Sequence, residues 1–339
     1  MSMKHYIEKC LAGESLSVDE ASDALEFIVS GGATDAQIAG LLIALRAKGE
    51  TVNEVVGFAR MMREKSIKVR VDDPDAIDIV GTGGDGLGTF NISTVAGFVA
   101  AGAGVTVAKH GNRSVSSQSG SADLLTALGV NIQLSPERVQ DSINKLGVGF
   151  LFAPLFHPAM KTAARARTEL GVRTIFNMVG PITNPASVTR QLVGAYSNTV
   201  AGLLAAALRE LQAKQSCVVH SDDGMDEVAL SGETNVIEVK GYEALRNYAL
   251  SASQFGLEAN TLAGVRGGTR EVNAVIAKSV LQGERGPARD VVVANAAMGI
   301  YVAGRSRTPR EGAEKAAASI DSGRAFAKLK AFVDFSNSP

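Results

Sequence analysis

The chain of 339 residues is 45% hydrophobic and 20% charged, which is enough apolar material to bury a large core and to divide into two domains. Its 34 basic and 35 acidic residues give a net charge of -1, which excludes a global attraction to nucleic acid or to an anionic membrane. Two distant cysteines exclude a disulfide framework and a paired-cysteine metal site, and the lack of a long apolar run leads us to expect a cytoplasmic protein.

The first seventy residues are expected to be helical. Three segments begin with a capping box, in which a hydroxyl and a Glu or Gln three residues later satisfy free backbone amides, at Ser17, Thr34 and Thr51. Behind the boxes, apolar residues recur at helical spacing. A polar, proline-containing turn at 71–75 then changes the pattern, so we expect a helical domain over residues 1–72 and an α/β domain over residues 73–339.

Beyond this turn, strand-like and helix-like segments alternate. Strands are predicted at 77–80, 105–108, 217–220 and 236–239, and helices at 93–101, 201–210 and 290–302. This alternation predicts a central, mostly parallel sheet flanked by helices. The last residues, 335–339, are predicted to be unstructured.

A glycine-rich segment, Gly81–Thr89 (GTGGDGLGT), follows the first predicted strand, and a helix is expected to begin near Asn91–Thr94 (NIST). Glycines let backbone amides approach a ligand closely, and a helix N-terminus adds the positive end of its dipole, so this geometry suits phosphate groups. The segment has neither the Lys of a Walker loop nor the acidic partner of a dinucleotide fold. A tight turn for close packing is the alternative interpretation.

A second polar cluster, Lys109–Ser117 (KHGNRSVSS), comes directly after the predicted strand at 105–108. Ligands of open α/β sheets bind outside the carboxyl ends of the strands, so this cluster and the glycine-rich segment are expected to face one crevice. Two positive charges, an imidazole, an amide and three hydroxyls suit a polyphosphate ligand, whereas a solvated surface loop is the alternative.

A third cluster, His220–Glu227 (HSDDGMDE), gathers four carboxylates after another predicted strand. Oxygen ligands of this kind suit magnesium, which proteins hold with one or two carboxylates together with substrate phosphates. A solvated acidic turn is the alternative, but the two phosphate-suited loops favour a magnesium site.

Arg167 and the segment from Arg173 to Pro185 (RTIFNMVGPITNP) complete the candidate set. An arginine can hold a substrate carboxylate through two hydrogen bonds, and the two prolines would stiffen the connection. The residues themselves do not distinguish a carboxylate clamp from an internal ion pair.

Taken together and in order, GTGGD, NIST, KHGNRSVSS, the Asp226–Glu227 pair, RTIFN and GPITNP resemble the anthranilate phosphoribosyltransferase family over nearly the whole chain. Met178-Val179 stands where leucines are more usual in that family. The resemblance implies a nucleoside phosphorylase-like fold, here with helices within residues 160–185 completing the helical domain, and a homodimer joined through that domain. It also implies that magnesium and 5-phosphoribosyl 1-diphosphate are needed to convert anthranilate into N-(5-phosphoribosyl)anthranilate and diphosphate in tryptophan biosynthesis.

The resemblance also assigns site residues. Those matching the positions that bind the phosphoribosyl diphosphate donor are Gly81, Gly84, Asp85, Thr89, Asn91, Ile92, Ser93, Thr94, Lys109, His110, Gly111, Asn112, Arg113, Ser114, Val115, Ser116, Ser117 and Ser121. Those matching the magnesium positions are Ser93, Asp226 and Glu227, and those matching anthranilate positions are Gly81, Asn112, His157 and Arg167. Lys109, His110 and Arg167 are the expected catalytic residues, whereas Asp222 and Asp223 have no ligand role by this resemblance.

Two rival functions remain at this stage. A pyrimidine nucleoside phosphorylase shares the fold class and a similar glycine-rich loop, but its basic motif differs from the KHGNR found here. A non-catalytic relative that binds nucleic acid is disfavoured by the net charge and by the retained Asp226, Glu227 and Arg167.

Overall fold

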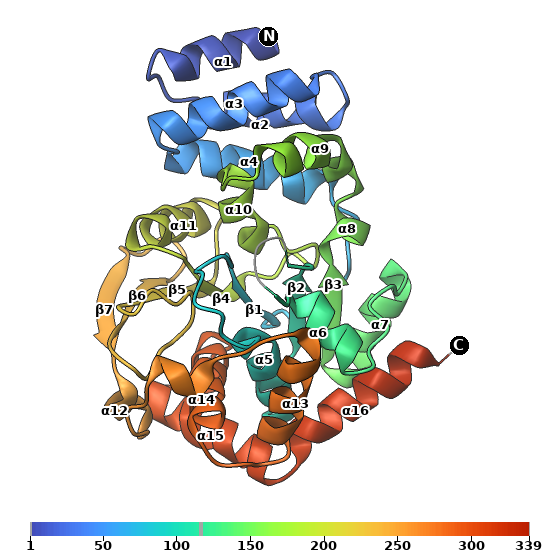
Figure 1. Ribbon diagram of the computed structural model, residues 1–339, viewed down its shortest axis with the longest axis vertical. Coiled ribbons are helices and arrows are strands. Elements are labelled where there is room, and N and C mark those ends of the chain that lie inside the picture. The colour runs from blue at the N-terminus through green and yellow to red at the C-terminus, as the bar shows by residue number, and fades with distance from the viewer. Residues whose placement is uncertain (1, 115–117, 339) are drawn as a thin grey trace.

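The computed structural model describes residues 2–114 and 118–338. Its N-terminal helices form a separate layer at one end of the molecule (Figure 1). They are α1 (Met3–Leu11), α2 (Val18–Val29), α3 (Asp35–Lys48) and α4 (Val52–Lys65). The predicted capping boxes are confirmed at the starts of α2, α3 and α4, where Ser17, Thr34 and Thr51 each exchange hydrogen bonds with the residue three positions later.

The rest of the chain is built on one twisted sheet, which within the described residues has seven strands. The strands are β1 (Ile77–Gly81), β2 (Val107–Gly111), β3 (Val148–Phe152), β4 (Arg190–Gly194), β5 (Gln215–Ser221), β6 (Thr234–Val239) and β7 (Arg246–Leu250). They are ordered β3-β2-β1-β4-β5-β6-β7. The first five in this order are parallel, while β6 and β7 are antiparallel, so the predicted mostly parallel sheet is confirmed.

Helices cover both faces of the sheet (Figure 1). Between β1 and β4 the chain forms α5 (Ile92–Gly102), α6 (Ser121–Ala127), α7 (Pro136–Leu146), α8 (Ala153–Phe156), η1 (Pro158–Met160), α9 (Lys161–Leu170), α10 (Ile175–Val179) and η2 (Gly180–Ile182). After β4 it forms α11 (Asn198–Glu210), α12 (Ala252–Phe255), η3 (Leu262–Val265), α13 (Arg270–Leu281), α14 (Pro287–Val302), α15 (Pro309–Asp321) and α16 (Arg324–Asn337).

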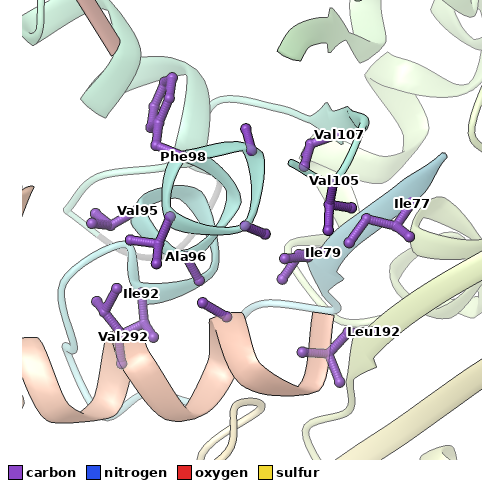
Figure 2. Packing of buried hydrophobic residues seen from close by; sticks show 14 of the residues in the cluster. Ile77, Ile79, Ile92, Val95, Ala96, Phe98, Val105, Val107, Leu192 and Val292 are labelled. Atoms are coloured by element: carbon purple, nitrogen blue, oxygen red, sulfur yellow. The ribbon is translucent and has the colours of Figure 1, made fainter. Parts of the chain in front are cut away.

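Two apolar cores lie on either side of the sheet. In the larger one, α5 and α14 pack on β1, and its members include Ile77 and Ile79 of β1, Val95 of α5 and Val292 of α14 (Figure 2). The smaller core joins α1–α4 to α9, α10, α11 and the opposite sheet face, which contributes Val193. The chain between β3 and β4 therefore returns to the helical layer, and α9 packs there against α2 and α3.

Two predicted boundaries were wrong. The second strand was expected at 105–108, but β2 runs from Val107 to Gly111, so Lys109, His110 and Gly111 belong to the strand and not to the loop after it. The C-terminal tail was expected to be unstructured, but α16 continues to Asn337. It is held there because Ser336 is buried and accepts a hydrogen bond from the amide of Asn131, at 3.0 Å.

Candidate active site

The candidate site lies where the order of the parallel strands reverses. From β1 the chain moves outward through β2 and β3, and it then returns to the other side of β1 as β4. Crevices that bind ligands form at the carboxyl ends of strands at such a switch point. Here β1 and β4 end at Gly81 and Gly194, and both glycines lie against Asp226.

The glycine-rich segment connects β1 to α5, as predicted. Gly83, Gly84, Gly86 and Gly88 all have φ between 66° and 79°, a conformation that residues with a side chain rarely adopt. The amide of Gly83 donates to Oδ2 of Asp226 at 2.6 Å, and a Cβ on Gly81 would come within 2.5 Å of the same oxygen. Glycine is therefore required here for close approach to a carboxylate of a distant loop.

Asp226 contacts the glycine-rich segment, and Glu227, the next residue, contacts the start of α5. The amide of Ser93, in the first turn of α5, donates to Oε1 of Glu227 at 3.1 Å. A carboxylate in this place is stabilised by the positive end of the helix dipole. The three residues predicted to hold magnesium are thus brought together by the fold, although Ser93 is more than 130 residues from the acid pair in sequence.

Burial raises the free energy needed to ionise Asp226 and Glu227. Loss of hydration raises the pKa of Asp226 to about 6, and the negative charge of Asp85 adds to the shift. Burial, followed by the charge of Asp226, raises the pKa of Glu227 to about 8. Within residues 2–114 and 118–338 neither carboxylate forms an ion pair, and the nearby charge of Lys109 only partly offsets the rise in the pKa of Glu227, so a bound cation would favour ionisation of both groups.

Lys109 and His110 point to opposite faces of the sheet because successive side chains alternate along a strand. Lys109 is buried against α5, where Nζ donates to the carbonyl of Ile79 and to Oγ of Ser93, the latter at 3.4 Å. Burial lowers the pKa of Lys109, an effect that the charges of Asp78 and Glu227 oppose. Lys109 therefore lies beneath the donor crevice and beside Ser93.

His110 lies on the face toward the helical layer, beside His157. Their ring centroids are 5.2 Å apart, and Nε2 of each ring is buried without a hydrogen-bond partner among the described residues. Burial, followed by the positive charge of the other ring, lowers the pKa of His110 to about 3. Burial and the charge of Lys68 lower the pKa of His157 to about 4. Both rings are therefore neutral at neutral pH.

Arg167 is positioned by α9, with its guanidinium carbon 4.9 Å from the centre of the Phe176 ring. Burial lowers the pKa of this side chain. In the part of the chain that the structure describes, its guanidinium makes no ion pair, whereas its neighbour Arg165 pairs with Glu169 and Asp35. The internal ion pair considered as an alternative is therefore not found among the described residues.

One group of the predicted donor residues lies around the start of α6. Arg113 pairs with Asp123 at 2.8 Å, and the amide of Ser114 donates to the same carboxylate at 3.1 Å. Ser121 donates to the carbonyl of Asn112 at 3.2 Å. Val115, Ser116 and Ser117 lie outside the described residues.

The other predicted donor residues lie between β1 and the first turn of α5. Asn91 is fixed by hydrogen bonds with Ser119 and Asn273. The Thr94 hydroxyl and Oδ2 of Asp85 are buried without a partner among the described residues. Thr89 forms an isolated bridge with Arg266, and Ile92 is fully buried.

A further buried carboxylate, Asp78, lies beneath the site and was not identified from the sequence. Asp78 accepts hydrogen bonds from the amide of His110 at 3.2 Å and from Nδ2 of Asn184 at 2.8 Å. Burial raises the pKa of Asp78 to about 7. The signal was present in the sequence, because an aspartate within an apolar strand is a buried charge that needs partners.

Arg173 joins the helical layer to the glycine-rich segment. Its guanidinium donates to the carbonyl of Gly84 and lies over the ring of Tyr196, 4.2 Å from the ring centre. Arg46 of α3 donates to the carbonyl of Arg173. The segment is thus held from the helical side as well as by Asp226.

Comparison with known proteins decides the family. Residues 73–326 match the model of the glycosyl transferase family, a/b domain, and residues 4–66 match the helical bundle domain of the same family. The anthranilate phosphoribosyltransferase of Pelotomaculum thermopropionicum is 50% identical over 98% of this chain and 96% of its own. That of Aquifex aeolicus is 47% identical over 99% and 98%. The chain belongs to the anthranilate phosphoribosyltransferase family.

Solved structures of the anthranilate phosphoribosyltransferase family agree with the fold. The Thermus thermophilus enzyme superposes with a TM-score of 0.93 at 44% identity, covering 98% of this chain and 99% of its own. The Saccharomyces cerevisiae enzyme in complex with PRPP and Mg superposes with a TM-score of 0.91 at 31% identity, covering 99% and 98%. Both the resemblance seen in the sequence and the predicted fold class are confirmed.

Proposed function

We propose that this chain transfers the phosphoribosyl group of 5-phosphoribosyl 1-diphosphate to anthranilate, giving N-(5-phosphoribosyl)anthranilate and diphosphate in tryptophan biosynthesis. One observation carries the proposal. The glycine-rich segment and the start of α5 both bond to the Asp226–Glu227 pair, at Gly83 and Ser93, at the switch point of a parallel sheet. Such a crevice offers backbone amides to phosphates and carboxylates to the cation that accompanies them.

Magnesium is the proposed cofactor, with Ser93, Asp226 and Glu227 as the residues that hold it. The donor set fits this ion, which proteins bind through one or two carboxylates and substrate phosphates, and neither of the two buried carboxylates forms an ion pair among the described residues. When bound, magnesium supplies charge neutralisation for the departing diphosphate.

The reaction is proposed to be a displacement at the anomeric carbon of the ribose. The amine nitrogen of anthranilate forms a bond to this carbon with its lone pair, the bond to the diphosphate oxygen breaks with its electron pair, and the nitrogen then releases a proton. Amides of the glycine-rich segment and Lys109 would stabilise the negative charge that develops on the leaving group. Arg167 and Asn112 would hold the anthranilate carboxylate so that its amine faces the reacting carbon.

A general base is not assigned. An arylamine already carries a free lone pair, so attack needs no prior removal of a proton. His110 is the nearest imidazole by sequence, and its low pKa leaves it neutral, with Nε2 free to accept a hydrogen bond near the acceptor. His157 and Gly81 complete the proposed acceptor site.

We further propose a homodimer formed through the helical domain, which comprises residues 1–72 and helices within residues 160–185. Leu11 on α1 and Ile43 on α3 support this proposal, because these apolar side chains are 71% and 40% exposed on the layer farthest from the sheet (Figure 1). The α/β domain of this proposal spans residues 73–339. A cytoplasmic location is proposed with it, and none of the helices in residues 2–114 and 118–338 has the length and apolar character to cross a membrane.

Anthranilate fluorescence tests the proposed function directly. When purified protein is mixed with phosphoribosyl diphosphate, magnesium and anthranilate, the anthranilate fluorescence is expected to fall as anthranilate is converted. A chelator is expected to prevent this fall. Unchanged fluorescence with folded protein and excess magnesium would refute anthranilate as the acceptor.

A further inference from the structure

The acid pair lies in an irregular connection between β5 and β6, which raises the question of what fixes its carboxylates. The connection runs from residue 222 to residue 233 and contains no helix or strand. An unsupported loop would let two like-charged, buried carboxylates move apart. Their proximity to Gly83 and Ser93 therefore requires anchors on both sides of the pair.

The anchor before the pair is Ser221, the last residue of β5. Its amide donates to the carbonyl of Met225 at 3.1 Å, and its Oγ accepts from the amide of Met225 at 3.0 Å. The backbone of Asp226 packs closely against the end of β4, where a Cβ on Gly194 would lie 1.6 Å from the carbonyl oxygen of Asp226. The start of the pair is thus fixed by the sheet.

The anchor after the pair is Asn295, on α14. Its Oδ1 accepts from the amide of Val228 at 2.9 Å, and its Nδ2 donates to the carbonyl of the same residue at 2.9 Å. The second Nδ2 hydrogen is used by the carbonyl of Val291 one turn earlier in the helix, at 2.9 Å. The amide therefore pairs with Val228 as a neighbouring strand would, and both of its donor hydrogens are used.

The surroundings of Asn295 make this pairing specific. Asn295 and Val228 are both fully buried, and α14 around them consists of valine and alanine. Water cannot replace the amide in such a place, so an apolar residue at 295 would leave both backbone groups of Val228 without partners. Val228 directly follows Glu227, so any shift needed to satisfy those groups would move the carboxylate.

We propose that Asn295 is a positioning residue for the cation site, acting through Val228 on Glu227 and Asp226. This inference rests on the proposed function, because the role given to Asn295 is to hold the proposed magnesium ligands in place. A positioning role for Asn295 differs from a purely structural role in one respect. Loss of the Asn295 amide must weaken the cation site more than it weakens the fold or the acceptor site.

The test compares Asn295→Ala with Ser142→Ala. Ser142 is a matched control because it is also fully buried and donates to a backbone carbonyl, that of Val148 at 2.6 Å, at the β3 edge of the sheet. Binding is followed by the loss of the free Mn²⁺ electron paramagnetic resonance signal when protein is added to Mn²⁺ and phosphoribosyl diphosphate. Melting temperature and the KM for anthranilate are measured for each variant.

Asn295→Ala is expected to raise the Mn²⁺ dissociation constant by about tenfold or more, as is typical when an outer partner of a metal ligand is lost, with the KM for anthranilate within twofold of the original. Ser142→Ala is expected to lower the melting temperature without changing Mn²⁺ affinity. If Asn295→Ala does not fold, Asn295→Ser, which can keep the bond to Val291, is judged by the same criteria.

Mn²⁺ affinity within twofold of the original protein in a folded variant would overturn the inference, as would failure of both variants to fold, which would make Asn295 a residue of global stability. Absence of Mn²⁺ binding by the unmodified protein would instead refute the proposed function. The two failures are therefore distinguishable.

Discussion

The two sides of the candidate site are built in opposite ways. On the proposed donor side, the groups around the acid pair bond to one another: Gly83 and Ser93 hold the pair, and Asn295 holds the chain after it, while the Thr94 hydroxyl and Oδ2 of Asp85 have no partner among the described residues. On the proposed acceptor side, Nε2 of His110 and Nε2 of His157 are buried without partners among the described residues, and the guanidinium of Arg167 lies over the Phe176 ring without an ion pair. A side whose groups are already hydrogen-bonded is preorganised, whereas unsatisfied buried groups gain the most when a ligand arrives.

The largest expected effect comes from removing the charge of the donor side. Asp226→Asn combined with Glu227→Gln keeps size and acceptor oxygens but removes the two charges that would hold magnesium. We expect transfer to fall on the order of 10³-fold, because charge stabilisation by a bound metal contributes several kcal/mol. Steady-state rates across magnesium concentrations measure this effect, and a loss under tenfold would contradict the assigned metal site.

The same double variant is expected to be more stable at pH 8 without metal. The native state raises the pKa of Asp226 to about 6 and of Glu227 to about 8, so it binds these protons more tightly than the unfolded chain does. Native stability is then lost as the pH rises from about 4 through these pKa values, and neutral side chains avoid that loss. Urea unfolding at pH 8 checks the sign, and a less stable variant would contradict it.

A smaller, more selective effect is expected on the acceptor side. Arg167→Ala removes a charged donor that has no acceptor of its own in the described structure, so the fold should keep its stability while the KM for anthranilate rises. Loss of a hydrogen bond to a charged group costs about 1.5–3 kcal/mol, which corresponds to roughly ten- to hundredfold. The KM for phosphoribosyl diphosphate should change little.

Arg165→Ala is the matched control for Arg167→Ala. Arg165 lies on the same helix, but its side chain is 75% exposed and paired with Glu169. Its removal should leave both KM values unchanged. An equal rise in the KM values for anthranilate and for phosphoribosyl diphosphate on Arg167→Ala would contradict the assignment of Arg167 to the acceptor side.

The smallest expected effect concerns the pH dependence of stability. Burial lowers the pKa of His157 to about 4, against about 6.5 for an unperturbed histidine. Between these values the unfolded chain binds a proton that the native state does not, so native stability falls as the pH falls through this window. His157→Asn should reduce that slope by up to one proton, or about 1.4 kcal/mol per pH unit.

His5→Asn serves as the control for the pH experiment, because His5 lies exposed on α1, far from the candidate site. Urea unfolding at several pH values between 4 and 6.5 gives both slopes. An unchanged slope for His157→Asn would contradict the buried, neutral state of this ring.

Local signals in the sequence predicted more of the fold than of the site. Capping boxes at Ser17, Thr34 and Thr51 and the apolar strand at 77–80 identified their elements because they act within a few residues. The end of β2 was misplaced because Lys109 and His110 are polar residues inside a strand, where tertiary partners outweigh local polarity.

The site required contacts that no local pattern records. The motifs indicated which loops carry chemistry, but the sequence did not indicate that Lys109 lies beneath the crevice or that Arg113 pairs with Asp123. Asn295 was not predicted, because a single amide in an apolar helix has a role only through its hydrogen bonds with the backbone of Val228, which lies 67 residues earlier. Assignments of individual residues to donor, acceptor and metal remain predictions.

The most direct test of the central claim is the stoichiometry of the reaction. Anthranilate consumed, diphosphate released and N-(5-phosphoribosyl)anthranilate formed are measured together in one reaction, the last by mass spectrometry. Phosphoribosyl transfer predicts equal amounts of all three, with none formed when magnesium is chelated. Diphosphate release without loss of anthranilate would contradict the account, because the donor would then be passed to water or to another acceptor.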